Sequence, residues 1–269
     1  MSPGPLFTVI IPTRDRPELL HRAVSSVLAQ TVADLECLIV DDGGGTGLAL
    51  PADARIRVLR TGGGEGASVA RNLGISGARG RLLGFLDDDD EITPDRLALG
   101  ITGLAGATIA LCWRSSIPGN GRPDWCRRVV GSADSLLAGP IPSLGQTVLA
   151  RDLTPLFDPR FEVSEDVEWW VRASAVGTIM TIPRVGYLVR NHPGPRQTSR
   201  LRERLKARQL LLETHAEFFA ARPKLAAYQW KRLGGMAKRA GERQLARRAF
   251  TFSFKLDPKV STALRLVST

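Results

Sequence analysis

Short apolar runs and helical periodicity alternate along the first two thirds of the chain. The apolar runs are rich in Val, Ile and Leu and predict buried strands at 7–11, 35–40, 56–59, 82–86 and 108–112. Between them, apolar residues recur every three or four positions, which predicts helices over 19–28, over 67–78 and from 94 onward. Strands that alternate with helices are typical of βαβ units, so the pattern predicts an α/β fold with a mainly parallel sheet.

The later part of the chain changes character. A helix is predicted over 165–174 and short strands over 178–182 and 186–190, and the pattern is helical from Leu201 onward. We therefore expect an α/β domain over 1–199 and a helical C-terminal appendage over 200–269. Within 227–260, either a single helical hairpin of tetratricopeptide type or an ordinary pair of packed helices is expected. The residues near the repeat spacing are Trp230, Leu233, Gly234, Ala246, Phe250 and Pro258.

The net charge of +10 is concentrated in the helical appendage. Residues 201–269 hold 16 Lys or Arg and 5 Asp or Glu, whereas the first 200 residues hold 21 and 22. Such a basic region either forms solvated helix faces or binds an anionic membrane surface, an acidic partner or a second copy of the chain. Nucleic acid is not expected as a partner, because the basic residues are not interleaved with aromatic residues that stack on bases.

Composition also limits the class and the compartment. No apolar run approaches the roughly 20 residues of a membrane span, and no basic segment precedes the short apolar run at the N-terminus, so we expect no signal peptide. Cys37, Cys112 and Cys126 form neither a CxxC pair nor an even set, which argues against a disulfide framework or a zinc site. We expect a cytoplasmic protein, peripheral at the inner face of the membrane if the basic appendage binds lipid.

The stretch LLGFLDDDDEITPDRL, residues 82–97, leads from a predicted strand into four consecutive aspartates. Like charges repel and burial increases the cost, so the run is either a solvated acidic turn or a cation site. Mg²⁺ and Mn²⁺ prefer carboxylate oxygens, often together with phosphate oxygens. Asp87 and Asp89 would point the same way if the chain stays extended, and Asp88 and Asp90 the other way.

Polar residues also follow the ends of other predicted strands. Because ligands bind at the carboxyl edge of parallel sheets, Thr13-Arg14-Asp15 and Asp41-Asp42 should converge with the aspartates on one rim. A carboxylate at Asp41-Asp42 can accept a hydrogen bond from a base or ribose, although Asp-Gly also favours a turn. Arg71 can pair with the aspartates or with phosphate. The Glu165-Asp166 pair is either a helix cap or the source of a general base.

A competing interpretation comes from GGGEGA, residues 62–67. The segment follows a predicted strand, opens a predicted helix and matches G-x-G-x-x-A, with Asp87 at the end of the next strand. That local pattern is typical of a Rossmann unit that binds NAD or FAD. It begins at the third strand rather than the first, however, and it leaves four aspartates beside a diphosphate without a role.

The order of these motifs resembles family 2 glycosyltransferases of the GT-A fold. The resemblance covers about residues 7–190 and rests on four stretches, TVIIPTRDRPELLHRAVSSVLAQT, LECLIVDDG, GASVARNLGISGARGRLLGFLDDDDEITPDRL and FEVSEDVEWWVRAS. It implies a Rossmann-like GT-A domain, a nucleotide-diphospho-sugar donor, a divalent metal (Mn²⁺ or Mg²⁺) and inversion at the anomeric carbon of the sugar.

By position, the resemblance also implies roles for individual residues. Asp166 would be the catalytic base, with Glu165 beside it, and Asp89, the last residue of the D-x-D, would bind the metal. The residues implied to bind the donor are Pro12, Thr13, Arg14, Asp41, Asp42, Arg71, Asp87 and Asp88.

The sequence departs from the family pattern in places. The first loop reads Thr13-Arg14-Asp15-Arg16, where the family usually has Thr-Tyr-Asn-Arg. The four aspartates leave the metal ligand open between Asp89 and Asp90. His192, in NHPGPR, is either a solvated loop residue, a further metal ligand or a contact to the donor phosphate.

The sequence therefore predicts an inverting, hexosyltransferase-type enzyme with a UDP-sugar as the favoured donor. Its acceptor would be a glycan, a lipid, a peptide or a small molecule. Two alternatives stay open at this point. One is an NAD(P)-dependent oxidoreductase that uses residues 62–67, and the other is a non-catalytic module that binds a nucleotide-sugar or a partner and has no need of Asp166.

Overall fold

The computed structural model describes residues 4–44, 47–119, 121–191 and 200–259. Its strands are β1 (Phe7–Thr13), β2 (Leu35–Asp41), β3 (Ile56–Arg60), β4 (Leu82–Phe85), β5 (Glu91–Ile92), β6 (Ile109–Ile117), β7 (Pro123–Trp125), β8 (Val130–Ser132), β9 (Thr147–Ala150) and β10 (Thr178–Arg190). Its helices are α1 (Pro17–Leu28), α2 (Ala67–Gly77), α3 (Arg96–Leu104), α4 (Asp134–Leu137), α5 (Glu165–Ala173), α6 (Leu201–Thr214), α7 (Ala216–Ala220), α8 (Pro223–Arg239) and α9 (Arg243–Leu256). Two 3-10 helices, η1 (Leu144–Gln146) and η2 (Arg151–Leu153), flank β9.

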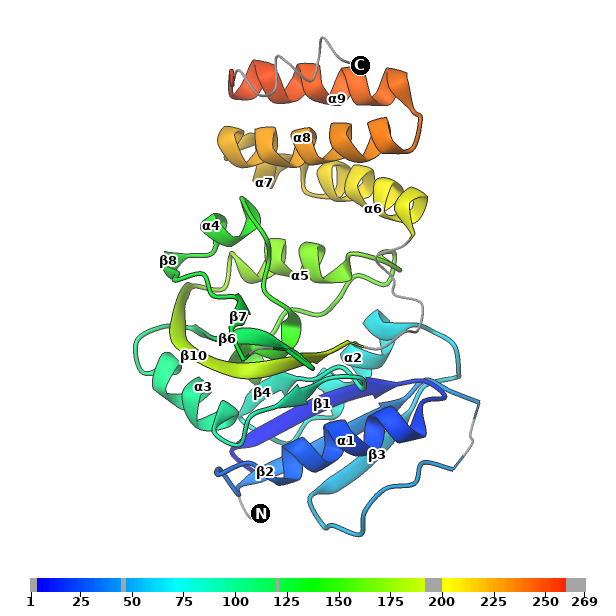
Figure 1. The fold of residues 1–269 in the computed structure, drawn as a ribbon, viewed down its shortest axis with the longest axis vertical. Helices are drawn as coiled ribbons and strands as arrows, with labels where there is room; N and C mark the ends of the chain where they lie inside the picture. The colour runs from blue at the N-terminus through cyan, green and yellow to red at the C-terminus, as the bar shows by residue number, and fades with distance from the viewer. Residues whose placement is uncertain (1–3, 45–46, 120, 192–199, 260–269) are drawn as a thin grey trace.

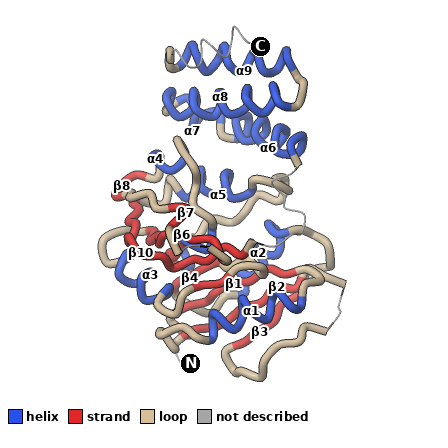
Figure 2. The backbone as a smooth tube through the Cα atoms, in the orientation of Figure 1, coloured by secondary structure: helices blue, strands red, loops and turns tan. Residues whose placement is uncertain are grey.

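The strands form one mixed sheet in the order β3-β2-β1-β4-β9-β6-β10-β5, with β7 beside β6 and β8 beside β10. The first four neighbours, β3 to β4, are mutually parallel, and β6 is parallel to β10. Strand β9 runs antiparallel to both of its neighbours, and β5 runs antiparallel to β10. The predicted α/β class with a mainly parallel sheet is therefore confirmed. Figure 2 shows the strands gathered in the body, with the C-terminal helices beyond them.

Helices cover both faces of the sheet, so the side chains of β1 are buried on both sides. Phe7, Val9 and Ile11 belong to one hydrophobic cluster with α1 and α3, whereas Ile10 belongs to a second cluster with α2 and α5. Successive side chains of a strand point to opposite faces, so a parallel strand covered on both faces needs a continuous apolar run.

The structure differs from the sequence prediction in several elements. Strand β1 continues through Pro12 to Thr13, because β4 pairs with β1 only as far as Ile10 and no ladder bond from Pro12 is needed on that side. The two strands predicted over 178–190 are one strand, β10, which shifts its register on β6 between Ile182 and Val185. Strands β5, β7, β8 and β9 were not predicted, because two to four residues are too few to show a period.

The C-terminal helices are stacked on α5 in successive layers, with α9 outermost (Figure 1). The hydrophobic cluster that contains Trp169 and Trp170 of α5 continues into α6, α8 and α9. The ring Nε2 of His215, at the end of α6, also lies 2.9 Å from Glu168 Oε1 on α5. The described part of the appendage thus shares one core with the body, and a boundary at 199/200 stays a prediction.

Helices α8 and α9 form a hairpin around the residues that carry the repeat-like spacing. Leu233, Gly234, Ala246 and Phe250 are all buried, and a Cβ on Gly234 would lie 2.8 Å from the Phe250 ring. Gly234 therefore allows close approach of the two helices. Among the described residues, no helix is both long enough and apolar enough to cross a membrane.

Candidate active site

The polar ends of three strands meet at the carboxyl edge of the sheet, as the sequence predicted. Thr13 ends β1, and its hydroxyl donates a hydrogen bond of 2.8 Å to Asp88 Oδ2. The backbone N–H of Asp42, just after β2, donates to the carbonyl oxygen of Thr13 at 2.9 Å. Parallel pairing of β1 with β2 and β4 produces this arrangement, because it brings the ends of all three strands to one edge.

The four aspartates turn instead of continuing the strand. The N–H of Asp90 donates to the carbonyl of Asp87 at 3.1 Å, which closes a tight turn over Asp88-Asp89. The alternation expected for an extended chain therefore does not apply. Arg16 Nη1 lies 3.3 Å from Asp88 Oδ1 and 3.6 Å from Asp89 Oδ2, so one guanidinium faces two of the carboxylates.

Asp90 points into the protein. It is 7% exposed, and its carboxylate accepts hydrogen bonds from the Tyr187 hydroxyl at 2.5 Å and from the Arg190 backbone N–H at 2.9 Å. Burial and the charge of Asp87 raise the pKa of Asp90 to about 7. Asp90 thus ties the acidic turn to β10.

Arg71 of α2 forms ion pairs with carboxylates from two other parts of the site. Its guanidinium is buried and donates to Asp87 Oδ1 at 2.8 Å and to Glu165 Oε1 at 3.0 Å. It also lies over the Phe157 ring, with its Cζ 5.4 Å from the ring centroid. Burial opposes its charge, but the two carboxylates outweigh burial and raise the pKa of Arg71 further. The side chain stays charged and holds α2, the acidic turn and α5 together.

Two cavities lie on either side of Arg71. The aspartate cavity, about 460 Å³, is lined by Pro12, Thr13, Arg14, Arg16, Asp42, Gly66, Ala67, Ala70, Arg71, the four aspartates 87–90, Glu165, Val189 and Arg190. The arginine cavity, about 260 Å³, lies between the body and the C-terminal helices, and its charged lining residues are Arg71, Asp87, Glu165, Asp166, Arg204, Arg208 and Arg232. Because Arg71, Asp87 and Glu165 line both, these three side chains form a shared wall.

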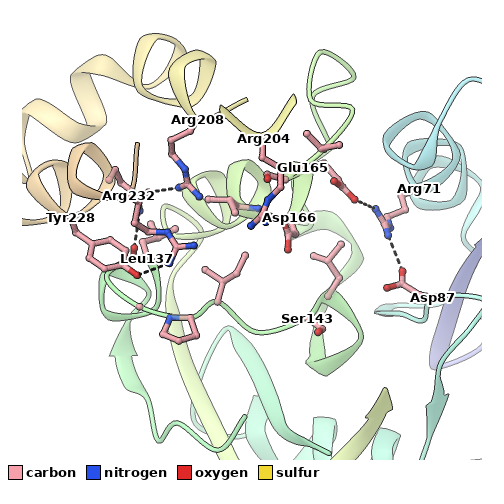
Figure 3. Close-up of a pocket in the computed structure, with 18 residues that line it drawn as sticks. Arg71, Asp87, Leu137, Ser143, Glu165, Asp166, Arg204, Arg208, Tyr228 and Arg232 are labelled. Atoms are coloured by element: carbon pink, nitrogen blue, oxygen red, sulfur yellow. Dashed lines mark hydrogen bonds and ion pairs between the residues drawn. The ribbon is translucent and has the colours of Figure 1, made fainter. Parts of the chain in front are cut away.

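Asp166 faces the arginine cavity from the first turn of α5 (Figure 3). Ser164, two residues before Asp166, has a left-handed backbone with φ of 60°. This conformation is unusual for a non-glycine residue and often occurs near functional sites. Asp166 Oδ1 accepts a hydrogen bond of 2.8 Å from the Val167 N–H. Burial and the neighbouring Glu165 raise the pKa of Asp166 to about 6. At neutral pH the carboxylate is therefore mainly ionised and can accept a proton. A pKa raised toward the operating pH suits a general base.

Asp42 holds the glycine-rich loop that suggested dinucleotide binding. Its carboxylate accepts hydrogen bonds from the Thr61 hydroxyl at 2.5 Å and from the N–H groups of Glu65 and Gly66 at 2.9 Å each. Burial would raise the pKa of Asp42, but these hydrogen bonds outweigh burial and lower the pKa. The loop follows β3, which is an edge strand, and two of its amides are bound to a carboxylate of the same chain rather than aimed at a diphosphate.

The remaining predicted residues are placed as follows. Pro12 and Arg14 line the aspartate cavity. Asp41 does not line it. The Asp41 side chain is buried elsewhere, with Oδ1 accepting a hydrogen bond from the Gly43 N–H at 3.0 Å and Oδ2 lying 3.5 Å from Arg60 Nε. His192 lies outside the described residues.

Sequence reasoning missed residues on both sides of the shared wall. Arg16 and Tyr187 contact the acidic turn, and the basic composition of the appendage did not indicate which of its arginines face the site. Arg16 has a local signal in the first loop, next to Pro17. Tyr187, by contrast, is 97 positions from Asp90, and no sequence spacing connects them.

The donor set of the aspartate cavity fits a hard divalent cation in part. In the described ranges, no group of three or more His, Cys, Asp or Glu side chains is arranged to hold a metal ion by itself. Carboxylates of the D-x-D, Asp87 and Asp89, line the cavity, and Mg²⁺ or Mn²⁺ commonly takes one or two carboxylates together with phosphate oxygens and water. The residues therefore fit a metal that is held jointly with a diphosphate.

This combination of a mainly parallel sheet, a carboxyl-edge cavity and a D-x-D turn is typical of nucleotide-binding α/β proteins. The model of glycosyl transferase family 2 matches residues 8–145, just over half of the chain, and the chain belongs to this family. The NAD(P) oxidoreductase interpretation of residues 62–67 is accordingly wrong, and the glycine loop is bound by Asp42 instead.

Curated relatives support the same family, and solved structures support the same fold. The UDP-Glc:alpha-D-GlcNAc-diphosphoundecaprenol beta-1,3-glucosyltransferase WfgD of Escherichia coli is 33% identical over 112 residues, which are 40% of this chain and 44% of WfgD. The matches to several other curated relatives span only about a third of their length. The S. aureus TarS 1–349 structure has a TM-score of 0.70 at 16% identity and covers 94% of this chain and 81% of its own. The mannosyltransferase PcManGT of Pyrobaculum calidifontis, solved with GDP-Man and Mn²⁺, has a TM-score of 0.62 at 17% identity and covers 98% and 79%. These similarities confirm the GT-A-like α/β fold with C-terminal helices.

Proposed function

We propose that this protein is an inverting, metal-dependent glycosyltransferase that transfers a hexose from a nucleotide-diphospho-sugar to an acceptor nucleophile. The observation that carries the proposal is the shared wall. Arg71, Asp87 and Glu165 separate a cavity rich in aspartates from a cavity that contains Asp166. The donor occupies the aspartate cavity, the acceptor enters the arginine cavity, and the reacting atoms meet at the wall.

On the donor side, we assign the roles that the resemblance to the family implies. Pro12, Thr13, Arg14 and Asp42 border the nucleoside, Asp42 acting mainly by fixing the glycine loop. Asp87 and Asp88 border the ribose and the sugar. Asp41 is buried and supports the loop after β2 by accepting a hydrogen bond from the Gly43 N–H. A UDP-sugar is the favoured donor, in line with UDP-Glc in the name of WfgD and with a TarS structure solved with UDP-GlcNAc.

Asp89, rather than Asp90, is the main metal ligand in this proposal. The Asp90 carboxylate is engaged by Tyr187 and Arg190 inside the protein, whereas the Asp89 side chain is 23% exposed and lines the aspartate cavity. A divalent cation bound there, as Mn²⁺ is present in the PcManGT structure, would neutralise charge on the leaving diphosphate. His192 is a further candidate ligand.

The chemical step uses Asp166 as the base. Its carboxylate takes the proton of the acceptor hydroxyl as the acceptor oxygen attacks the anomeric carbon. The bond from that carbon to the diphosphate oxygen breaks, and its electron pair leaves with the diphosphate. One in-line displacement inverts the configuration. Glu165 does not serve as the base, because it is bound to Arg71; it positions Arg71 and the start of α5.

A thermal-shift panel tests the proposal. UDP-, GDP- and dTDP-sugars and NAD(H) would each be added with and without Mn²⁺, because a ligand that binds the native state raises the apparent melting temperature. One nucleotide-sugar is expected to give a shift that needs Mn²⁺. A metal-independent shift with NAD(H) alone would refute the proposal. A non-catalytic nucleotide-sugar module would bind the donor but release no UDP when acceptors are supplied.

For the C-terminal appendage, proposed to extend over 200–269, we propose an anionic membrane surface as the partner. The outer face of α9 exposes Arg247, Arg248, Phe252, Lys255 and Leu256, which combines positive charge with apolar side chains as interfacial helices do. Such attachment would place the enzyme at the cytoplasmic face of the membrane. Flotation with liposomes should need anionic lipid and weaken with salt. Equal binding to neutral liposomes, or self-association of the chain without liposomes, would count against lipid as the partner.

A further inference from the structure

The arginine cavity contains more positive charge than its own carboxylates neutralise. Arg204 and Arg208 of α6 and Arg232 of α8 extend toward the side of the cavity where Asp166 lies (Figure 3). Arg71 belongs to the shared wall with Asp87 and Glu165. The other charged lining residues are the three arginines of the appendage and Asp166, so the lining as a whole has four arginines and three carboxylates, an excess of one positive charge.

Arg208 is held in place by hydrogen bonds, and its charge is buried. It is 6% exposed, it donates a hydrogen bond to Gln229 Oε1, and Gln229 Nε2 in turn donates to the Leu137 carbonyl at 2.8 Å. Burial and repulsion by Arg232 lower the pKa of Arg208 to about 10. Two guanidinium groups held close together in a partly buried site are favourable when an anion lies between them.

We propose that the arginine cavity binds a phosphate or diphosphate group of the acceptor, so that the acceptor of this enzyme is a phosphorylated molecule. The inference rests on the proposed function and names the acceptor class for the same site. Guanidinium forks match phosphate oxygens, and the three arginines of the appendage present several such forks on one side of the cavity.

The cavity also fits this occupant in size and lining. Its volume of about 260 Å³ lies just below the roughly 300–1,000 Å³ of small-molecule pockets, so it suits one end of an acceptor. Leu137, Pro140 and Ile141 add an apolar side next to the arginines. Asp166 lines the same cavity, so a phosphate held by the arginines would bring a hydroxyl of the same molecule to the base.

The first test uses inorganic phosphate as the probe. Phosphate is titrated calorimetrically into the full chain saturated with UDP and Mn²⁺, so that the aspartate cavity is filled. We expect binding that weakens at least about tenfold in Arg208→Gln and in Arg232→Gln, because each removes a charge-assisted hydrogen bond. Arg232 is exposed, so its variant keeps the test decisive if the buried Arg208→Gln unfolds.

Matched controls come from the same helices. Arg202 of α6 and Arg239 of α8 are exposed arginines that do not line the cavity. Arg202→Gln and Arg239→Gln should bind phosphate like the unaltered protein. If phosphate binding weakened equally in all four variants, it would reflect the overall positive charge of the protein and not a specific site, and the proposal would be wrong. The absence of any phosphate binding would also overturn the proposal.

The second test compares acceptors by the release of UDP. Soluble sugar 1-phosphates and sugar diphospholipids are each compared with the neutral methyl or alkyl glycoside of the same sugar, and with a uronic acid. Faster turnover of either phosphorylated set, lost in Arg232→Gln, supports the proposal, and the arm that responds shows whether the phosphate belongs to a soluble acceptor or to a lipid. Equal or faster turnover of the neutral glycosides, or of the uronic acid, would overturn it. Donor-induced thermal shifts, measured in parallel, report on the proposed function separately.

Discussion

Arg71 Nη1 lies 3.0 Å from Glu165 Oε1, an ion pair between residues 94 positions apart. The same guanidinium reaches Asp87 at 2.8 Å, so one side chain connects α2, the acidic turn and the start of α5. The connection explains how four successive aspartates are tolerated at the end of a buried strand. Each faces a different set of partners, and two of those partners are the cations Arg71 and Arg16.

Replacing Arg71 should destabilise the protein strongly. In Arg71→Met, the buried Glu165 loses its cationic partner, and breaking a buried ion pair from one side typically costs about 3–5 kcal/mol. We expect a loss near the lower figure in urea unfolding, because the Asp87 side chain is 40% exposed and can be rehydrated. The control is Arg151→Met, whose partner Asp152 is exposed, and it should change the free energy of unfolding by less than about 1 kcal/mol. Similar losses in the two variants would show that Arg71 does not hold these elements together.

Asp166→Asn should abolish turnover while donor binding persists. Loss of a general base typically lowers the rate by about 10²–10⁴-fold, and Asp166 lines the cavity opposite to the proposed donor. The rate is measured as UDP release and donor binding as a Mn²⁺-dependent thermal shift. Glu162→Gln, an exposed change in the same segment, serves as the control and should leave both unaltered. Full turnover by Asp166→Asn would assign the base elsewhere.

The pH dependence of turnover should report the pKa of Asp166, which burial and Glu165 raise to about 6. The base acts in its ionised form, so the rate should rise with pH through about 6 and level off above it. Below that pKa, the rate should fall about tenfold per pH unit, because the fraction of ionised base falls by that factor. Initial rates between pH 5 and 8 at saturating donor and Mn²⁺ would check this. A profile that is flat across this range is not compatible with Asp166 as the base.

Asp89 and Asp90 should respond differently to amide substitution. Asp89→Asn is expected to raise the Mn²⁺ concentration needed for the donor-induced thermal shift by tenfold or more, since it removes a charged ligand. Asp90→Asn should leave that concentration nearly unchanged and lower the melting temperature. Its NH₂ group would have to face Tyr187 or the Arg190 N–H, where a carboxylate oxygen now accepts. The reverse pattern would make Asp90 the metal ligand.

Gly145→Ala should be among the more damaging small substitutions. A Cβ at Gly145 would lie 1.9 Å from the Tyr187 ring, which is fully buried and holds Asp90. Overpacking of this kind usually costs about 1–3 kcal/mol, and displacement of Tyr187 would also disturb the acidic turn. Gly84→Ala is the matched control, because the nearest atom to its Cβ would be 3.9 Å away. Chemical denaturation of both variants gives the comparison, and equal stability would contradict the packing argument.

Much of the donor side was predictable because its signals are local. The strand ends, the D-x-D run and Arg71 in its helix each lie within short motifs, and parallel pairing necessarily collects the ends of β1, β2 and β4 at one edge. Two local interpretations failed. The extended form assumed for Asp87–Asp90 gave way to a turn that Asp90 closes, and the glycine loop at 62–66 has its amides bound by Asp42. Both depend on contacts with residues outside the motif.

The sequence by itself determined the α/β class, the alternation of strands and helices along the N-terminal half, the family and the presence of a basic helical appendage. Those properties are periodic or compositional, so they are encoded over short distances. Only the tertiary structure decided that Tyr187 holds Asp90, that Arg71 and Glu165 form a wall between two cavities, and that three arginines of α6 and α8 face Asp166. These contacts join residues up to 97 positions apart. Those of Tyr187 and Arg71 form within the α/β body, whereas the three arginines reach the cavity because the appendage packs on α5.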